Sequence, residues 1–512
     1  MLVKTFGCAV FGIRAITVTV EVYMDQGIQF FMVGLPDNAV KESHQRIESA
    51  LRTNGYRIPG KKIIINMAPA DIRKEGSAYD LTIAIGILGA NEVIKTGRLE
   101  QYMIMGELSL DGGLLPVKGA LPIAIEARNR GFKGILLPVM NAREASIVSG
   151  LEVYGVATLK EVIGFFNETD TLFPANVPVL DEFTRQAPRY ECDFAEVRGQ
   201  ECIKRALEIA AAGGHNVLLI GPPGAGKTML AKRLPSILPP LNLQEAVETT
   251  KIHSVAGKLG SQRSLISTRP FRAPHHTISD MALVGGGGIP QPGEISLAHN
   301  GVLFLDELPE FKRSVLEVLR QPMEDRVVTI SRARATLEYP ASFMLVAAMN
   351  PCPCGYYNHP AVPCQCAGGE VQKYINKISG PLFDRIDIHI EVTPVDFTKL
   401  SDKRPSEQSK TIRQRVTNAR KIQERRFAGL PGIHSNAQIP SRMLRDICRV
   451  GEDGTLLLKT AMERLGLSAR AYDRILKVSR TIADIESSAD IKLEHLAEAI
   501  NYRSLDRDNW GK

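Results

Sequence analysis

The segment that most constrains the fold is "GPPGAGKT", residues 221–228, which matches the pattern G-x-x-x-x-G-K-T. An apolar stretch, "NVLLI", precedes it, and a helical pattern, "MLAKRLPSIL", follows it. A strand, a glycine-rich loop and a helix in this order direct backbone amides and a helix N-terminus at a phosphate group. We therefore predict a nucleotide site whose binding residues are Gly221, Pro222, Pro223, Gly224, Ala225, Gly226, Lys227 and Thr228.

Other apolar stretches lie between residues 191 and 395, where helical patterns separate them, as is typical of a buried parallel sheet. One of them, "GVLFLDE", ends in Asp306 and Glu307. Two acidic residues after a strand are, taken alone, often only a polar strand end. Beside a phosphate loop, Asp306 would hold Mg²⁺ together with Thr228, and Glu307 would polarise the attacking water.

Four further residues complete the candidate catalytic set of Lys227, Asp306, Glu307, Asn350, Arg385 and Arg470. Lys227 would contact the β- and γ-phosphates, and Asn350, which ends "FMLVAAMN", would sense the γ-phosphate. Arg385, in "LFDRID", is either part of a surface ion pair or an arginine that reaches the ATP of a neighbouring subunit. Arg470 begins a helical pattern and is a candidate second sensor.

Half of the eight cysteines lie in one loop, "NPCPCGYYNHPAVPCQC", residues 350–366. Clustered thiols in a reducing compartment indicate a metal before they indicate disulfides. Four thiolates would close a tetrahedral Zn²⁺ site, and His359 is an alternative ligand. Free thiols and disulfides are the other interpretations. The candidate zinc ligands are Cys352, Cys354, Cys364 and Cys366.

The chain has 512 residues, which is too long for one core, so we expect several domains. Residues 1–165 show mixed strand and helix patterns and predict an α+β domain. Residues 166–190 hold three prolines and little periodicity, which indicates a linker. Residues 191–395 predict the parallel-sheet nucleotide domain, and residues 396–512 a helical domain. The expected fold class is therefore multidomain α/β.

Within the first domain, "AITVTVEVYM" (15–24) alternates like a half-buried strand, and "IQFFMVG" (28–34) is a candidate partner for it. The N-terminus runs into this alternating sequence, so we interpret it as structure and not as a signal peptide. No apolar run reaches the ~18 residues that a membrane span needs. We expect a soluble, cytoplasmic protein.

Net charge is +7, and residues 399–426 alone hold ten lysines and arginines against three acidic residues. This basic segment is either a solvated helix face or a contact for a polyanion. The tetraglycine at 285–288 is a second feature compatible with a DNA-contacting loop. His275 and His276 are adjacent and not four residues apart, so we expect loop or hydrogen-bonding residues and not metal ligands.

The phosphate loop, "RPFRAPHHTISDMALVGGGG", "LFLDEL", Asn350 and "LFDRID" together resemble the magnesium-chelatase branch of the AAA+ ATPases. The N-terminal domain and the cysteine loop resemble the ComM/YifB family within that branch. The resemblance implies a homo-oligomeric ring, expected to be a hexamer, that hydrolyses ATP with Mg²⁺ at subunit interfaces. It also implies that residues 268–300 form an insertion facing the pore, and that the ring acts on DNA as a branch-migration or helicase-like motor in recombination.

Two segments of the first domain, "APADIRKEGSAYDLTIAIGIL" and "GELSLDGGLLPVKGALPIAIEARNRGFKGILLP", resemble the Lon-protease domain, which uses a serine–lysine dyad. The aligned dyad positions hold Ala78 and Ile123. Ser77 would be a displaced nucleophile without a base, unless Lys74 or Lys118 took the place of the missing dyad lysine. We expect a Lon-like fold without peptidase chemistry, which would serve oligomerisation or guide a substrate.

Two other functions remain open from the sequence. One is a metal-insertion motor like magnesium chelatase itself, which would need partner subunits. The other is a protein-remodelling ATPase or protease, which the missing dyad disfavours.

Overall fold

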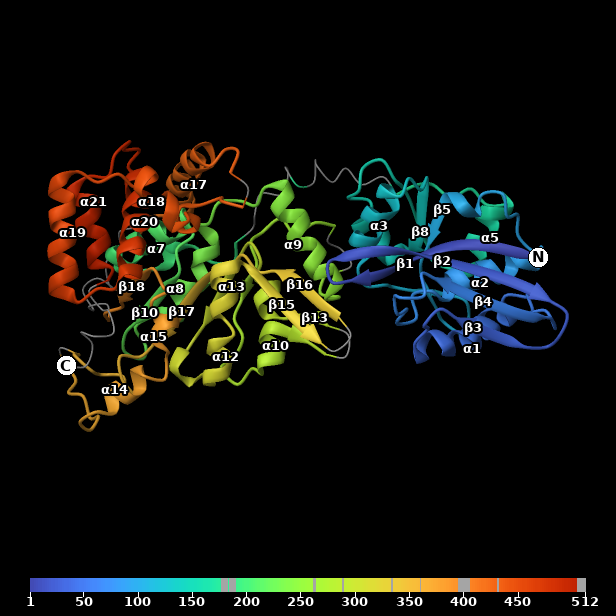
Figure 1. Ribbon diagram of the computed structural model, residues 1–512, viewed down its shortest axis with the longest axis horizontal. Helices are drawn as coiled ribbons and strands as arrows, with labels where there is room; N and C mark the ends of the chain where they lie inside the picture. Colours follow the sequence, from blue (N-terminus) through green and yellow to red (C-terminus); the bar gives the residue numbers. More distant parts are fainter. Residues whose placement is uncertain are drawn as a thin grey trace. The chain divides into compact units, whose positions relative to one another are not determined.

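The computed structural model describes residues 1–175, 183, 190–260, 264–287, 290–332, 335–359, 361–394, 406–430 and 432–503. The chain forms two compact units (Figure 1): a first unit of Met1–Ala187 and Leu243–Ser267, and a second unit of Pro188–Asn242 and Thr268–Lys512. No helix in the described part of the chain combines the length and apolar character needed to cross a membrane. Most of the predicted linker, Gly288, the predicted boundary at residue 395 and the basic residues Lys399, Lys403 and Arg404 lie outside the described residues.

A seven-stranded sheet, in the order β3-β4-β2-β1-β5-β8-β9, forms the framework of the first unit. β1 and β2 pair antiparallel, and alternate side chains of β2 are buried, as residues 15–24 predict. The predicted pairing of residues 28–34 with this strand is wrong, because β4 pairs with β2 and β3 pairs with β4. The strands of this unit are β1 Leu2–Phe11, β2 Arg14–Asp25, β3 Phe30–Val33, β4 Lys62–Ala68, β5 Tyr102–Ile104, β8 Gly134–Pro138 and β9 Glu152–Val156, with the small pair β6 Glu107–Leu108 and β7 Leu114–Leu115.

The helices of the first unit come from two separate parts of the sequence. They are α1 Asn38–Thr53, α2 Asp80–Ala90, α3 Ala120–Asn129, α4 Val139–Ala145, α5 Leu159–Asn167 and α9 Leu243–Val255, with the 3₁₀ turn η1 Leu99–Gln101. α9 follows the phosphate loop in sequence, yet Val247 packs on the core around α3, and the carbonyl of Ser254 accepts a hydrogen bond from Gly119 N at 3.2 Å. Residues 243–267, which the sequence assigns to the nucleotide domain, therefore belong to the first unit.

A five-stranded parallel sheet, in the order β11-β14-β17-β10-β18, forms the framework of the second unit. The strands are β10 Val217–Ile220, β11 Phe271–Arg272, β14 Val302–Leu305, β17 Met344–Met349 and β18 Ile388–Glu391. Every residue of β10, β14 and β17 is buried, which explains their continuous apolar sequence. Because parallel strands end at a common edge, the residues that follow β10, β14 and β17 lie close together.

Further elements precede β10 or connect these strands. They are η2 Phe194–Glu196, α7 Glu201–Gly213, α8 Lys227–Arg233, η3 Leu234–Ser236, α10 Asp280–Val284, α11 Glu294–Leu297, η4 Leu308–Glu310, α12 Arg313–Glu317, α13 Arg320–Asp325, α14 Glu370–Ile375 and α15 Gly380–Phe383. Two antiparallel hairpins, β12 Gly285–Gly286 with β13 Gln291–Pro292 and β15 Val327–Arg332 with β16 Ala335–Pro340, stand outside the main sheet. Strand β12 of the first hairpin consists of two glycines of the predicted tetraglycine loop, Gly285 and Gly286.

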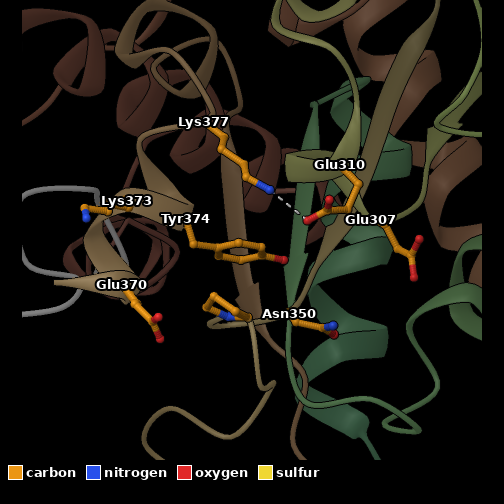
Figure 2. Close-up of a pocket in the computed structure, with 8 residues that line it drawn as sticks. Glu307, Glu310, Asn350, Glu370, Lys373, Tyr374 and Lys377 are labelled. Carbon is orange, nitrogen blue, oxygen red and sulfur yellow. Dashed lines mark hydrogen bonds and ion pairs between the residues drawn. The ribbon is translucent and has the colours of Figure 1, made fainter. Parts of the chain in front are cut away.

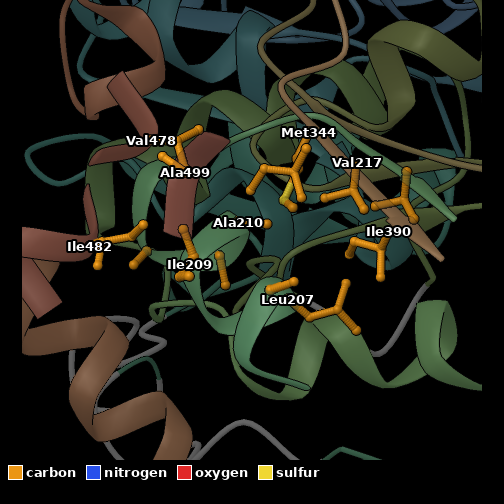
Figure 3. Close-up of a cluster of buried hydrophobic side chains, with 14 of the residues drawn as sticks. Leu207, Ile209, Ala210, Val217, Met344, Ile390, Val478, Ile482 and Ala499 are labelled. Carbon is orange, nitrogen blue, oxygen red and sulfur yellow. The ribbon is translucent and has the colours of Figure 1, made fainter. Parts of the chain in front are cut away.

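One apolar core joins the parallel sheet to the C-terminal helices (Figure 3). These helices are α17 Ser409–Arg426, α18 Ser441–Ile447, α19 Glu452–Leu465, α20 Ala469–Ile485 and α21 Leu493–Asn501, with the turn η5 Asn436–Gln438. α7 lies between the two parts, because it contacts β18 as well as α17 and α20. The buried residues in this core include Leu207, Ile209, Ala210, Val217, Met344, Ile390, Val478, Ile482 and Ala499.

Several arginines of the basic segment are used inside the protein. On α17, Arg415 forms an ion pair with Glu208 of α7 at 2.5 Å, and Arg426 bonds Asp484 of α20. The charge surplus of the sequence therefore overstates the positive charge that α17 offers to a partner. The exposed basic residues of this helix include Lys410, Lys421 and Arg425.

A buried carboxylate holds the C-terminal helices together. Asp484 Oδ2 accepts hydrogen bonds from Arg426 Nη1 and Asn436 Nδ2, both at 2.7 Å, and Oδ1 accepts one from Arg480 Nε at 3.1 Å. The Asp484 side chain is fully buried. Two guanidinium groups thus depend on one carboxylate for their counter-charge.

We predict that Asp484→Ala lowers the free energy of unfolding of the second unit by about 3–5 kcal/mol, because it leaves the buried Arg480 and the partly buried Arg426 without their counter-charge. Denaturant unfolding followed by circular dichroism measures the change. The matched control is Glu494→Ala on α21, which removes an exposed ion pair with Lys492. It should change the free energy of unfolding by less than about 1 kcal/mol. Equal effects of the two substitutions would contradict the prediction.

Candidate functional site

The phosphate loop lies between β10 and α8, as predicted, and its backbone is shaped by glycine. Gly226 has φ of 89° and immediately precedes α8, a conformation that residues with a side chain rarely adopt. Gly221 lies so close to the backbone of Val392 that an added Cβ would be 2.2 Å from its carbonyl oxygen. The loop therefore needs glycine at both positions, for two different steric reasons.

Lys227 is buried and makes three hydrogen bonds at the edge of the sheet. Its Nζ donates to the carbonyl oxygens of Gly221 (2.6 Å) and Pro222 (2.9 Å) and to Asn350 Oδ1 (3.0 Å). Burial lowers the pKa of Lys227, and the neighbouring carboxylates of Asp306 and Glu307 oppose this shift. The structure thus brings together two predicted site residues, Lys227 and Asn350, which are 123 positions apart in the sequence. The ammonium group fits a phosphate ligand, which would replace some of these oxygens.

Thr228 and Asp306 also meet at this edge. Thr228 Oγ1 donates a hydrogen bond to Asp306 Oδ2 at 2.6 Å. Asp306 follows β14, the strand next to β17, so the sheet sets this contact as well. A hydroxyl and a carboxylate oxygen side by side are the hard oxygen ligands that Mg²⁺ uses beside phosphate groups, so this pair fits the predicted metal.

Glu307 follows directly and has an unusual backbone. Its φ is 54°, and its N–H donates to Asp306 Oδ1 at 3.0 Å. The side chain is 58% exposed, and its Oε2 lies 3.2 Å from His276 Nδ1. His276 was expected to be a loop or hydrogen-bonding residue, but its partner was not predicted, because no spacing rule links residue 276 to residue 307.

A pocket of about 470 Å³ opens beside Glu307 and Asn350 (Figure 2). Sequence analysis missed its other wall, which α14 and the residues around it supply. Lys377 Nζ bonds Glu310 Oε1 at 3.1 Å across the pocket. The remaining lining residues are Pro353, Glu370, Lys373 and Tyr374.

The two predicted arginines lie away from this set of contacts. Arg385 is buried, and its Nη2 is 2.5 Å from Glu324 Oε1 while Nη1 donates to the carbonyl of Pro381 at 2.6 Å. Arg470 is 59% exposed, and its Nη1 is 3.8 Å from Asp384 Oδ2. Both arginines are thus grouped around the "LFDRID" turn, and the site assembled around Lys227 is built without them.

A third arginine near this turn was not predicted. Arg474 Nη1 is 3.1 Å from Oδ1 of the buried Asp387. Although burial acts in the opposite direction, Arg474 and His215 hold the pKa of Asp387 well below its usual range. The ion pair between Asp387 and Arg474 therefore attaches the turn that contains Arg385 to helix α20.

The four cysteines of the loop lie together. The Sγ atoms of Cys352 and Cys354 are 3.3 Å apart, and those of Cys354 and Cys364 are 3.5 Å apart. Together with Cys366 Sγ, these atoms all lie within 4.8 Å of one another. Thiolates bound tetrahedrally at ~2.3 Å from zinc would be ~3.8 Å apart, so the cluster fits the ion. Among the described residues, the group close enough to share an ion consists of the four cysteines and does not include His359, whose Nδ1 accepts hydrogen bonds from Ala361 N and Val362 N.

The cysteine loop also contacts the phosphate loop. Gly355 has φ of 87°, and an added Cβ there would be 2.6 Å from Pro223 Cδ. Asn350, which bonds Lys227, begins the cysteine loop, and the fully buried Cys352 follows two residues later. The two loops therefore touch at two places.

In the first unit, the positions aligned with a serine–lysine dyad do not form one. Ile123 on α3 is buried among apolar side chains, and the partly buried Ala78 packs against the same core. The hydroxyl of Ser77 donates to Glu107, and the buried Lys74 donates to the carbonyl of Pro69. Each of these polar groups thus has a partner other than the one that a dyad requires.

Comparison with known proteins gives matches along nearly the whole chain. Family models described as "Subunit ChlI of Mg-chelatase", "Magnesium chelatase, subunit ChlI" and "Magnesium chelatase, subunit ChlI C-terminal" match residues 20–141, 193–400 and 406–503. An alignment 154 positions long shows 32% identity to Lon protease 2 of Bacillus subtilis, and it covers 27% of this chain and 26% of that protein.

Several relatives match over nearly the full length of this chain. YifB of Escherichia coli is 45% identical over 504 residues, which cover 98% of this chain and 96% of that protein. Competence protein ComM of Haemophilus influenzae is 43% identical over 509 residues, which cover 99% and 98%. With its phosphate loop, parallel sheet and cysteine loop, the chain belongs to the ComM/YifB family of magnesium-chelatase-like proteins.

Proposed function

We propose that this protein is a Mg²⁺-dependent ATPase that works as a homo-oligomeric ring, expected to be a hexamer, and acts on DNA. The observation that carries the proposal is the convergence of Lys227 with Asn350 and of Thr228 with Asp306 at one sheet edge, with Glu307 beside them. Membership of a magnesium-chelatase-like family supports the motor class.

Each residue has a separate task in this proposal. The ammonium group of Lys227 and the backbone of the phosphate loop bind and orient the phosphates, and the Asn350 amide contacts the terminal one. Thr228 and Asp306 hold Mg²⁺, which neutralises charge on the phosphate oxygens when it is bound. Glu307 directly follows Asp306, and its side chain is exposed enough to accept a proton from the attacking water.

The proposal that DNA is the substrate has two supports. The Haemophilus relative is named as a competence protein, and the basic residues of α17 together with the glycine-rich hairpin offer candidate contacts. ATPase activity of the pure protein should therefore rise with single-stranded, duplex or branched DNA. Dependence on a partner protein or a porphyrin instead would favour a metal-insertion motor.

We also propose that the first unit has a Lon-like fold but does not cleave peptides. The local similarity to Lon protease 2 supports the fold. Two observations support the absence of peptidase activity. Ala78 and Ile123 have apolar surroundings, and Ser77 is hydrogen-bonded to Glu107. The unit would then serve oligomerisation or substrate guidance.

Lys227→Ala should abolish nucleotide binding, because it removes the only side-chain cation in the proposed phosphate cradle. Glu307→Gln should bind ATP but hydrolyse it about 10²- to 10³-fold more slowly, because the amide cannot accept the proton. Equilibrium nucleotide binding and phosphate release measure the two effects.

The matched control for the second variant is Glu310→Gln. Glu310 lies three residues further along the chain and pairs with Lys377, so its neutral variant should keep turnover within a few-fold of the wild type. A Glu307→Gln enzyme with wild-type turnover would show that another group accepts the proton.

Arg385 should act on the ATP of a neighbouring subunit. Arg385→Ala should inactivate the ring, and mixing it with Lys227→Ala subunits should restore part of the activity, because some interfaces then carry both intact parts. Glu324→Gln, which removes the carboxylate charge that pairs with Arg385 within its own chain, should keep activity. If Glu324→Gln were as inactive as Arg385→Ala, or if mixed rings showed no rescue, the ion pair would be structural.

The cysteine cluster should hold about one zinc per chain. The Cys364→Ser/Cys366→Ser double variant should lose the metal, whereas Cys192→Ser/Cys202→Ser, outside the cluster, should retain it. Metal analysis and thiol titration of the native protein check both outcomes. Four freely titratable thiols in the loop with little zinc would contradict the site.

A further inference from the structure

Asn216 immediately precedes β10, and its side chain bridges two distant segments at the amino end of the parallel sheet. Its Nδ2 donates a hydrogen bond to the carbonyl oxygen of Arg385 at 3.2 Å, and its Oδ1 accepts one from Leu345 N on β17 at 2.9 Å. An amide group has both the donor and the acceptor that this bridge requires. One side chain thus connects β17 to the turn that contains Arg385.

The backbone of Asn216 binds the same turn. Its N–H donates to Asp387 Oδ2 at 2.9 Å, and its carbonyl oxygen accepts hydrogen bonds from Asp387 N and Ile388 N, both at 3.0 Å. These bonds hold the end of the turn, whereas the side chain of Asn216 holds Arg385 itself. Loss of the side chain therefore removes the bond to Arg385 and leaves the backbone groups in place.

The sheet separates this turn from the phosphate loop of the same chain. β10 and β18 are parallel, with Val217 opposite Ile388 and Ile220 opposite Glu391. The phosphate loop follows the carboxyl end of β10, and the Arg385 turn precedes β18 at the amino end. β10 has four residues and is about 13 Å long. Arg385 thus lies at the edge of the sheet opposite to its own phosphate loop, which fits an action on a neighbouring subunit.

The other contacts of Arg385 act at the far end of its side chain. Nη2 is 2.5 Å from Glu324 Oε1, and Nη1 donates to the carbonyl of Pro381 at 2.6 Å. If the guanidinium group leaves Glu324 for a phosphate, the hydrogen bond from Asn216 still holds the backbone that carries it. This matters because a misplacement of about 1 Å can lower the rate of a reaction about 10²-fold.

We propose that Asn216 is a positioning residue for Arg385: it fixes the backbone from which the guanidinium group reaches the ATP of the neighbouring subunit. This inference rests on the proposed action of Arg385 on a neighbour. Asn216 adjoins the strand of its own phosphate loop, yet it serves the site of the next subunit. Loss of its side chain slows hydrolysis at that site and leaves ATP binding in its own subunit intact.

A residue that only stabilises the edge of the sheet offers the matched control. His299 Nδ1 accepts a hydrogen bond from Ser342 N at 3.1 Å, and His299 is buried. This bond connects the residues that precede β14 and β17 at the same edge. His299→Ala therefore removes a comparable anchor between a different pair of strands.

Asn216→Ala should lower kcat for ATP hydrolysis about tenfold to hundredfold and keep the Kd for ATP within about twofold. Asn216→Asp, which keeps the acceptor for Leu345 N but loses the donor to Arg385, should show the same loss. His299→Ala should keep kcat within a few-fold of the wild type. Steady-state hydrolysis, equilibrium nucleotide binding and thermal unfolding measure these effects, and an equal loss of kcat in His299→Ala would overturn the inference.

Mixed rings separate positioning of Arg385 from a general structural effect. In rings of Asn216→Ala and Lys227→Ala subunits, some interfaces combine an intact phosphate loop with an intact Arg385 turn, so part of the activity should return. Mixing Asn216→Ala with Arg385→Ala should restore no activity, because every subunit then carries a defective turn.

Two outcomes of the mixing experiment contradict the inference. Rescue by Arg385→Ala subunits would show that Asn216 serves its own phosphate loop, and absence of rescue in both mixtures would show that its role is structural. If Lys227→Ala and Arg385→Ala subunits did not rescue each other, the proposed action of Arg385 on a neighbour would fail first, whatever Asn216→Ala does.

Discussion

One buried ammonium group, Lys227 Nζ, connects separate parts of the second unit. It bonds two carbonyl oxygens of the phosphate loop and the amide oxygen of Asn350 at the end of the neighbouring strand. Without this positive charge, three oxygen atoms would face one another without a donor, which is unfavourable in a buried place. The contact therefore holds the loop after β10 against the residue that follows β17, and the other site residues are arranged around these two segments. Thr228, one residue further along α8, donates a hydrogen bond to Asp306 at the same edge of the sheet.

The same contact extends to the cysteine loop. Asn350 is both the partner of Lys227 and the first residue of that loop, and Gly355 touches Pro223 from the other side. The shape of the cysteine loop and the shape of the phosphate loop are consequently set together. A bound metal would give order to a loop that has few apolar anchors, since only Cys352 of its cysteines is fully buried.

The sequence was sufficient for those parts of the structure that depend on local patterns. The apolar strands before Gly221, Asp306 and Asn350 and the helix after the phosphate loop lie where they were expected, because strand burial and loop geometry are encoded within a few residues. Contacts between distant segments were not predictable in this way. β3 lies beside β4 and not β2, although the β2 and β3 patterns are compatible with pairing. The partners His276–Glu307 and Lys377–Glu310 carry no spacing signal at all, and the Arg385 partner Glu324 is 61 positions away from it.

The membership of α9 in the first unit has a practical consequence for work on separate parts of this chain. The polypeptide enters the second unit, returns to the first for residues 243–267, and enters the second again. A fragment that stops before the phosphate loop therefore lacks α9 and exposes the apolar surface on which Val247 packs. A fragment that begins after residue 190 carries α9 as an orphaned helix with its buried face in water. Neither fragment preserves the contacts between α9 and the rest of the first unit, so loss of activity in such a fragment would report misfolding before it reported the function of the missing half.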